Sequence, residues 1–100
     1  MTASLTEIVG RLRSERAALR KIGVRHLVLF GSVARGEAKS DSDVDIAVEI
    51  EPGAPFSLFL LEDTRLRLSQ ILGQQVDLGE ICSLREEARA SFEHDKVTVF

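Results

Sequence analysis

Asp43 and Asp45 stand two residues apart at the start of a segment in which polar and apolar residues alternate. In an extended strand, residues i and i+2 point to the same face and lie about 6.5–7 Å apart. Two carboxylates placed in this way repel each other unless a positive charge lies between them, and a hard divalent cation is the natural occupant. The pair therefore predicts a metal site, although two solvent-facing residues of an edge strand would show the same spacing.

A second feature lies twelve residues earlier and favours the metal site over the edge strand. Gly31 and Ser32 follow a short apolar segment, at a point where we expect a strand to give way to a helix. Backbone N–H groups at a helix start attract anions, and glycine lets a phosphate approach the chain closely. The Ser32 hydroxyl adds a further donor. A phosphate-binding loop beside a metal site is the equipment of phosphoryl or nucleotidyl transfer.

A third carboxylate would complete a site for two metal ions. Asp77 is the best candidate, because it is a lone acid within the short apolar segment Val76–Leu78. A strand next to that of Asp43 and Asp45 would bring Asp77 into the same cluster, where it could also deprotonate or orient an attacking hydroxyl. The alternative is that Asp77 is simply an exposed residue of its strand.

The loop between the two motifs offers weaker candidates. Arg35 could clamp a phosphate bidentately, and we retain it as a candidate nucleotide-binding residue. A structural role is favoured for Arg35, in which it pairs with Asp41 or another nearby acid and holds the loop. We expect Asp41 to occupy a turn rather than a metal site, and Ser42 to position Asp43. Lys39 could screen the charge of a triphosphate.

Hydrophobic periodicity and turn residues indicate an α/β fold. Ser4 and Glu7 fit a capping box, and a second capping box is expected from Ser83 to Glu86. The expected elements are helices over 5–22, 56–72 and 83–92, a short helix after Gly31, and strands over 26–30, 44–50, 76–78 and 97–100. This order predicts one small domain over residues 1–100, with a mixed β-sheet and helices packed against it. The apolar run 56–61 is either core, which we favour, or a partner surface.

Bulk properties limit the partners. A net charge of −3 supplies no strong basic field, so we expect no direct contact with nucleic acid. No apolar stretch approaches the ~20 residues of a membrane span, and no signal peptide is recognisable, so a cytoplasmic protein is expected. The single cysteine, Cys82, can form neither a disulfide within the chain nor a thiolate metal site, and is expected to be half-buried.

The two motifs together resemble a known family signature. The stretch Gly31-Ser32-Val33-Ala34-Arg35-Gly36, followed by Ser42-Asp43-Val44-Asp45, resembles that of the polymerase-beta-like nucleotidyltransferase superfamily. The resemblance runs from about His26 to Leu78, and more loosely over the whole chain. Within the superfamily, the small size is similar to that of the minimal nucleotidyltransferase (MNT) proteins, which are antitoxin partners of HEPN toxins.

The resemblance implies specific roles for the residues of the motifs. Gly31 and Ser32 would hold the triphosphate of ATP, Asp43 and Asp45 would ligate Mg²⁺, and Asp77 would complete the triad, with two ions expected. The reaction would transfer AMP from ATP to a hydroxyl, such as a tyrosine of the toxin, with release of pyrophosphate. So short a chain must take its acceptor site from a partner or a second copy, so a hetero-oligomer or homodimer is expected.

Two other functions remain open. A binding-only antitoxin would keep the fold and neutralise its toxin by covering it, without a metal ion. A small-molecule nucleotidyltransferase, similar to the antibiotic-modifying members, would label an acceptor without any protein partner. The intact set of acids argues against the first alternative, and the short chain argues against the second.

Overall fold

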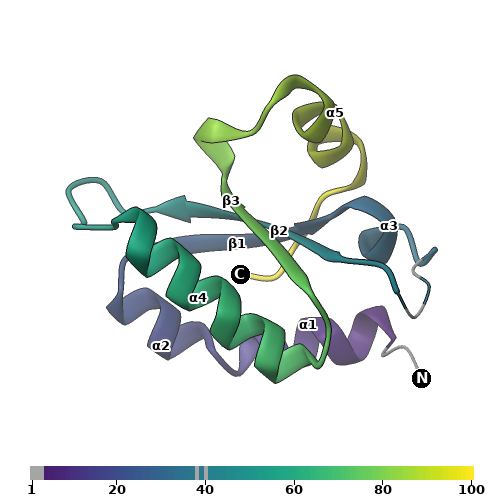
Figure 1. The fold of residues 1–100 in the computed structure, drawn as a ribbon, viewed down its shortest axis with the longest axis horizontal. Coiled ribbons are helices and arrows are strands. Elements are labelled where there is room, and N and C mark those ends of the chain that lie inside the picture. The colour runs from purple at the N-terminus through teal and green to yellow at the C-terminus, as the bar shows by residue number, and fades with distance from the viewer. Residues whose placement is uncertain (1–3, 38, 40) are drawn as a thin grey trace.

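The computed structural model describes residues 4–37, 39 and 41–100. Its elements are α1 (Leu5–Arg13), α2 (Arg16–Lys21), β1 (Val24–Phe30), α3 (Gly31–Ala34), β2 (Val44–Ile50), α4 (Leu58–Leu72), β3 (Val76–Glu80), the 3-10 turn η1 (Ile81–Ser83), α5 (Glu86–Asp95) and β4 (Val97–Thr98). The four strands form one sheet in the order β3-β2-β1-β4 (Figure 1). The predicted α/β class, with helices packed against a mixed sheet, is confirmed.

The sheet is mixed because its strands are joined in two different ways. Strand β1 runs antiparallel to both β2 and β4, whereas β3 runs parallel to β2. The long helix α4 connects β2 to β3, as a parallel pair requires a crossover. This crossover places β3 at the edge of the sheet, next to the strand that carries Asp45.

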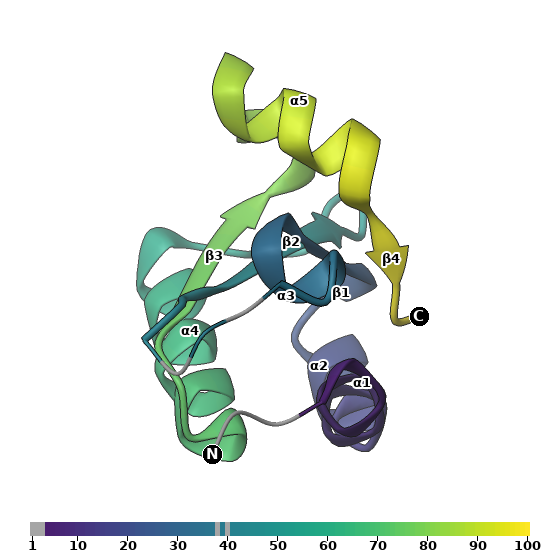
Figure 2. The same ribbon diagram turned by 90° about the vertical axis from the view of Figure 1, so that its right-hand side faces the viewer.

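Helices cover the two faces of the sheet unequally. Helices α1, α2 and α4 lie on one face, and α5 lies on the other (Figures 1 and 2). Val44, Ile46 and Val48 of β2 are fully buried in the larger core, on the first face. Because side chains alternate along a strand, Asp45 and Ala47 point to the α5 face. There Ala47 joins a smaller apolar cluster with Val28, Phe30 and Phe92.

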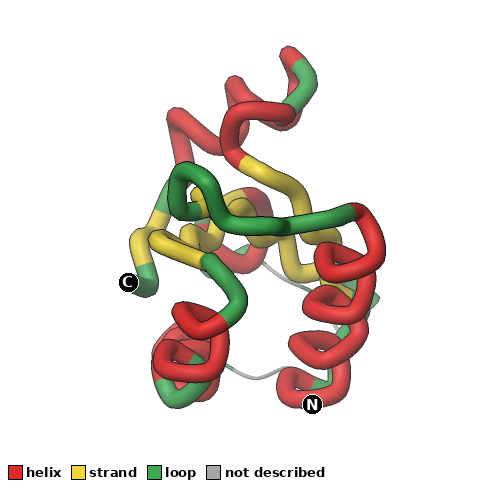
Figure 3. The backbone as a smooth tube through the Cα atoms, turned by 90° about the vertical axis from the view of Figure 1, so that its left-hand side faces the viewer, coloured by secondary structure: helices red, strands yellow, loops and turns green. Residues whose placement is uncertain are grey.

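The N-terminal helical region differs from the sequence prediction. The capping box is confirmed, since the Ser4 hydroxyl accepts a hydrogen bond from the Glu7 amide at 3.2 Å. The single helix expected over 5–22 is wrong, because α1 ends at Arg13 and α2 begins at Arg16. The Ser14 hydroxyl donates to the Arg11 carbonyl at 2.6 Å, a local hydrogen bond that competes with helix continuation. The tube view in Figure 3 shows the two helices separated by a short loop.

Three further expectations differ from the structure. Ser83 does not cap α5, because it ends the 3-10 turn η1 and the helix begins only at Glu86. The core interpretation of the run 56–61 fails for Leu58 and Phe59, which are 81% and 85% exposed at the start of α4. Helix α4 instead buries Thr64, Leu68 and Leu72, which follow one another at four-residue spacing on its inner face. Cys82 is exposed rather than half-buried.

Candidate active site

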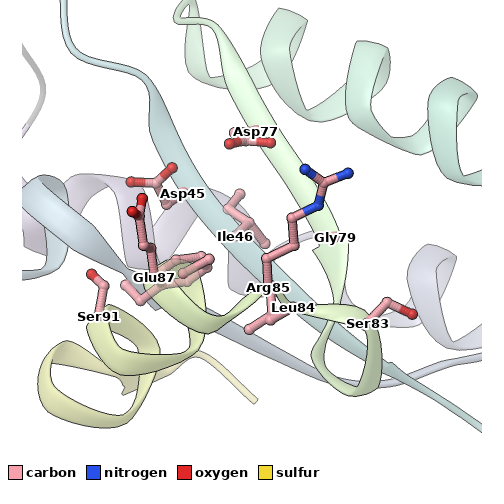
Figure 4. A pocket seen from close by; sticks show the side chains of 11 residues that line it. Asp45, Ile46, Asp77, Gly79, Ser83, Leu84, Arg85, Glu87 and Ser91 are labelled. Carbon is pink, nitrogen blue, oxygen red and sulfur yellow. The ribbon is translucent and has the colours of Figure 1, made fainter.

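The three aspartates of the sequence prediction gather at one end of the β2–β3 pair. Asp45 lies directly opposite Asp77 in the parallel register of the two strands, so both side chains project from the α5 face. Figure 4 shows the two carboxylates above the same part of the sheet. Asp43 is exposed and immediately precedes β2, two residues from Asp45. The predicted placement of the third acid on a strand beside the first two is confirmed.

Asp45 is the least favourably placed of these carboxylates for carrying a negative charge. Burial, the charge of Asp77 and the charge of Asp43 together raise the pKa of Asp45 to about 6. Such a group gains most from a bound cation, and three carboxylates offer the hard oxygen ligands that Mg²⁺ prefers. Among the described residues, no three His, Cys, Asp or Glu side chains already converge on one point as a ready metal site. The oxygen donors of the three aspartates nevertheless fit a hard divalent ion in their chemistry.

Position 31 requires glycine for two reasons, its backbone conformation and the close approach of the Asp45 side chain. Its φ of +74° lies in the left-handed region that favours glycine. A Cβ atom at this position would collide with the carboxylate oxygen Oδ2 of Asp45. The glycine, which the sequence suggested as a contact for phosphate, thus also makes room for the central carboxylate. Ser32 is half-buried beside it, in the first turn of α3.

Arg35 joins the first motif to α5. Its Nη1 donates to Asp95 Oδ2 at 2.7 Å, and its Nε donates to Glu37 Oε2 at 2.9 Å. These hydrogen bonds raise the pKa of Arg35 above its ordinary value. The structure therefore pairs Arg35 with acids other than Asp41, and the guanidinium is engaged within the described chain. Whether Arg35 also contacts the nucleotide stays a prediction.

Asp95 is the centre of this connection, and its side chain is only 4% exposed. Besides Arg35, it accepts hydrogen bonds from the Ser91 hydroxyl at 3.0 Å and from His94 Nδ1 at 2.6 Å. The His94 hydrogen bond, with those from Arg35 and Ser91, lowers the pKa of Asp95 to about 2. Sequence analysis missed Asp95, because it lies 60 residues from Arg35 and carries no motif of its own.

Asp95→Asn is expected to lower the Tm at pH 7 by about 5 °C, because breaking a buried hydrogen-bonded ion pair costs a small domain several degrees. A lowered pKa in the folded state means that this stabilisation is complete above the ordinary pKa of 3.8 and is lost as the pH falls toward about 2. Differential scanning calorimetry of the wild type and the variant should therefore give Tm values that differ at pH 7 and converge near pH 2. The matched control is Glu93→Gln, which removes an exposed partner of Lys96 on the same helix. Equal Tm values at pH 7 would contradict this role for Asp95.

An open cavity of about 560 Å³ lies between the sheet and α5. Its described lining residues are Phe30, Asp45, Ile46, Asp77, Gly79, Ser83, Leu84, Arg85, Glu87, Ala88 and Ser91. Phe30 and Leu84 contribute apolar side chains to the lining. Asp45 and Asp77 form one polar wall (Figure 4). The cavity thus places a surface for an organic ligand directly beside the carboxylates.

Comparison with known proteins identifies the family. The model of the nucleotidyltransferase domain family matches residues 9–99. The chain belongs to the nucleotidyltransferase family. This nucleotidyltransferase is 43% identical over 84 residues to the protein adenylyltransferase MntA of Thermococcus cleftensis, and the alignment covers 82% of each chain. The resemblance inferred from the two motifs is confirmed, and the protein is an enzyme of the nucleotidyltransferase class.

Solved structures support the same assignment. A minimal nucleotidyltransferase superimposes on this nucleotidyltransferase with a TM-score of 0.76 at 29% identity, covering 95% of both chains. A toxin–antitoxin crystal structure with AMP-PNP gives a TM-score of 0.72 at 21% identity, covering 90% of this chain and 72% of the other, and shows the same fold. Within the described residues, no helix is long and apolar enough to cross a membrane.

Proposed function

We propose that this nucleotidyltransferase transfers AMP from ATP to a hydroxyl group of a protein partner, and that it is the antitoxin of a HEPN-type toxin. The observation that carries the proposal is the register of β2 and β3, which sets Asp45 against Asp77 beside Gly31. The relative named protein adenylyltransferase supports AMP transfer to protein. The toxin–antitoxin structure with AMP-PNP, similar in fold, supports both the nucleotide and the partner.

The proposed reaction exchanges one bond to the α-phosphorus of ATP for another. The oxygen of the acceptor hydroxyl, for which we propose a tyrosine, bonds to this phosphorus while the bond to the bridging oxygen of the β-phosphate breaks. Pyrophosphate leaves, and the proton of the hydroxyl passes to Asp77, which is exposed and accessible to the acceptor. Gly31 and Ser32 bind the triphosphate on the other side of Asp45.

A divalent cation belongs to this mechanism. Asp43, Asp45 and Asp77 would hold Mg²⁺, with two ions proposed, which when bound polarises the phosphate and offsets the charge that develops there. Asp45 is the residue that links the other two, because it lies opposite Asp77 in the strand register and two residues after Asp43. The raised pKa of Asp45 indicates that this arrangement is unfavourable without a cation.

Two features of the structure support a protein as the acceptor. The cavity beside the carboxylates is open, so a side chain of another molecule can reach Asp77. Leu58 and Phe59 are largely exposed at the start of α4, as expected for an apolar surface that a partner covers. Of the two interpretations of the run 56–61, core or partner surface, we therefore propose the partner surface for Leu58 and Phe59.

The test uses ATP labelled at either the α- or the γ-phosphate, with Mg²⁺ and the HEPN-type protein encoded beside this gene. AMP transfer labels the partner from α-labelled ATP only, because the γ-phosphate leaves with pyrophosphate. Label from γ-labelled ATP would indicate phosphoryl transfer and overturn the proposal. A stable complex without label from either nucleotide would show a binding-only antitoxin, and labelling of an aminoglycoside without partner would show a small-molecule enzyme.

A further inference from the structure

The segment that follows β3 places one more charged side chain at the cavity. After η1, the chain turns back over the sheet and begins α5, and Arg85 is the residue at this turn. Figure 4 shows its side chain rising beside Gly79, with the guanidinium directed toward Asp77. Of the described residues that line the cavity, Arg85 is the only basic one.

The neighbouring arginines are already occupied. Arg35 pairs with Glu37 and Asp95, as described above. Arg65 on α4 pairs with Glu62 at 2.6 Å, and Arg89 on α5 donates to the Ile81 carbonyl at 3.1 Å. Among the described residues, Arg85 has no hydrogen-bond or ion-pair partner, although a guanidinium offers five donors. The side chain is therefore free to bind a ligand in the cavity.

The charge balance of the site indicates which ligand this is. Three carboxylates line the cavity, those of Asp45, Asp77 and Glu87, and Arg85 is the one basic side chain among the described lining residues. A nucleoside triphosphate brings several more negative charges to the same place. A fixed cation on the opposite wall favours its phosphates, and the planar fork of arginine matches two phosphate oxygens. Phe30 and Leu84 line the same cavity and offer an apolar surface for the flat ring of a nucleobase.

We propose that Arg85 binds the phosphate chain of the nucleotide. Arg85 lines the cavity at the start of α5, and Gly31 lies against Asp45, which lines the same cavity. In this proposal the phosphate chain runs from Gly31 and Ser32 past Asp45 to Arg85. This inference rests on the proposed function and adds to it a residue that neither sequence motif contains. Lysine at this position keeps the charge but loses the bidentate geometry.

Binding of ATP and of adenosine to the isolated chain, measured by isothermal titration calorimetry with Mg²⁺, tests the proposal without a partner. Arg85→Ala is expected to weaken ATP binding about 10- to 100-fold, the usual range for a lost charge-assisted pair, and to leave adenosine binding unchanged. Arg85→Lys should give an intermediate loss. The matched control is Arg11→Ala, which removes one exposed positive charge from α1, on the opposite face of the sheet.

Three other outcomes would overturn the proposal. Equal weakening of ATP and adenosine would show that Arg85 shapes the cavity rather than contacting phosphate. Unchanged ATP binding, with a raised KM for the protein partner, would assign Arg85 to the acceptor. An equal loss of ATP affinity in Arg85→Ala and Arg11→Ala would show that the effect comes from the net charge of the protein rather than from a contact of Arg85. If the wild type binds ATP but labels no partner, the proposed function fails while the assignment of Arg85 stands.

Discussion

Asp45→Asn is expected to reduce AMP transfer at least about 1,000-fold, since a lost metal ligand removes several kcal/mol of stabilisation from the transition state. Asparagine keeps the shape of the side chain but not its charge, so the divalent ion loses its central ligand. The rate of label transfer from α-labelled ATP, measured at saturating Mg²⁺, gives the effect directly. Asp43→Asn should act in the same direction, whereas Asp41→Asn, in the exposed loop, should transfer AMP at the wild-type rate.

The same substitution should not destabilise the metal-free protein. A pKa of about 6 for Asp45 in the folded state exceeds the ordinary value of 3.8, so the ionised group opposes folding at pH 7. Removing the charge is expected to stabilise the fold by about 1 kcal/mol, after allowance for solvent screening at a half-exposed group. The gain should be present above pH 6 and vanish below pH 3.8. A lower Tm for Asp45→Asn at pH 7, measured in EDTA, would contradict this account of the site.

Gly31→Ala has the second largest expected effect. The substitution places a methyl group where the Asp45 carboxylate lies, in a backbone conformation that alanine rarely adopts. We expect a loss of about 2–3 kcal/mol in the free energy of unfolding, as for other strained or overpacked positions, and at least a 100-fold loss of transfer. Urea denaturation and the transfer assay measure the two effects.

Gly36 supplies a matched control for Gly31. It has the same φ of +74°, but nothing lies within 4 Å of the position of an added Cβ atom. Gly36→Ala therefore isolates backbone strain, which should cost about 1 kcal/mol and leave transfer near the wild-type rate. If Gly31→Ala behaves like Gly36→Ala in both assays, the close approach of Asp45 to Gly31 has no functional importance.

The sequence predicted those parts of the site that depend on local periodicity. The alternation of Val44, Ile46 and Val48 placed Asp45 on the opposite face from the main core, and the structure agrees. The predicted placement of Asp77 on a strand beside that of Asp45 is confirmed, although the register that sets the two residues opposite each other depends on the β2–α4–β3 crossover. The role of Asp77 in the site stays a prediction. Local patterns carry this information because side chains alternate strictly along a strand.

The parts that were missed depend on tertiary contacts. The pairing of Arg35 with Asp95 joins residues 60 positions apart, and no local pattern indicates it. Arg85 was overlooked because its segment fits a capping box, whereas a 3-10 turn takes Ser83 out of the N-cap position and leaves Arg85 at the cavity. The exposure of Phe59 likewise depends on where α4 meets the sheet, which its composition does not determine.

Intact-mass spectrometry of the HEPN-type partner tests the central claim most directly. The partner is incubated with ATP and Mg²⁺ and with either the wild-type chain, Asp45→Asn or Arg11→Ala, and modified peptides are then mapped. The account predicts that the wild type and Arg11→Ala add the mass of AMP to a tyrosine, and that Asp45→Asn adds nothing. An unmodified partner with the wild type, or equal modification by Asp45→Asn, would contradict the claim that these carboxylates form the active site of a protein adenylyltransferase.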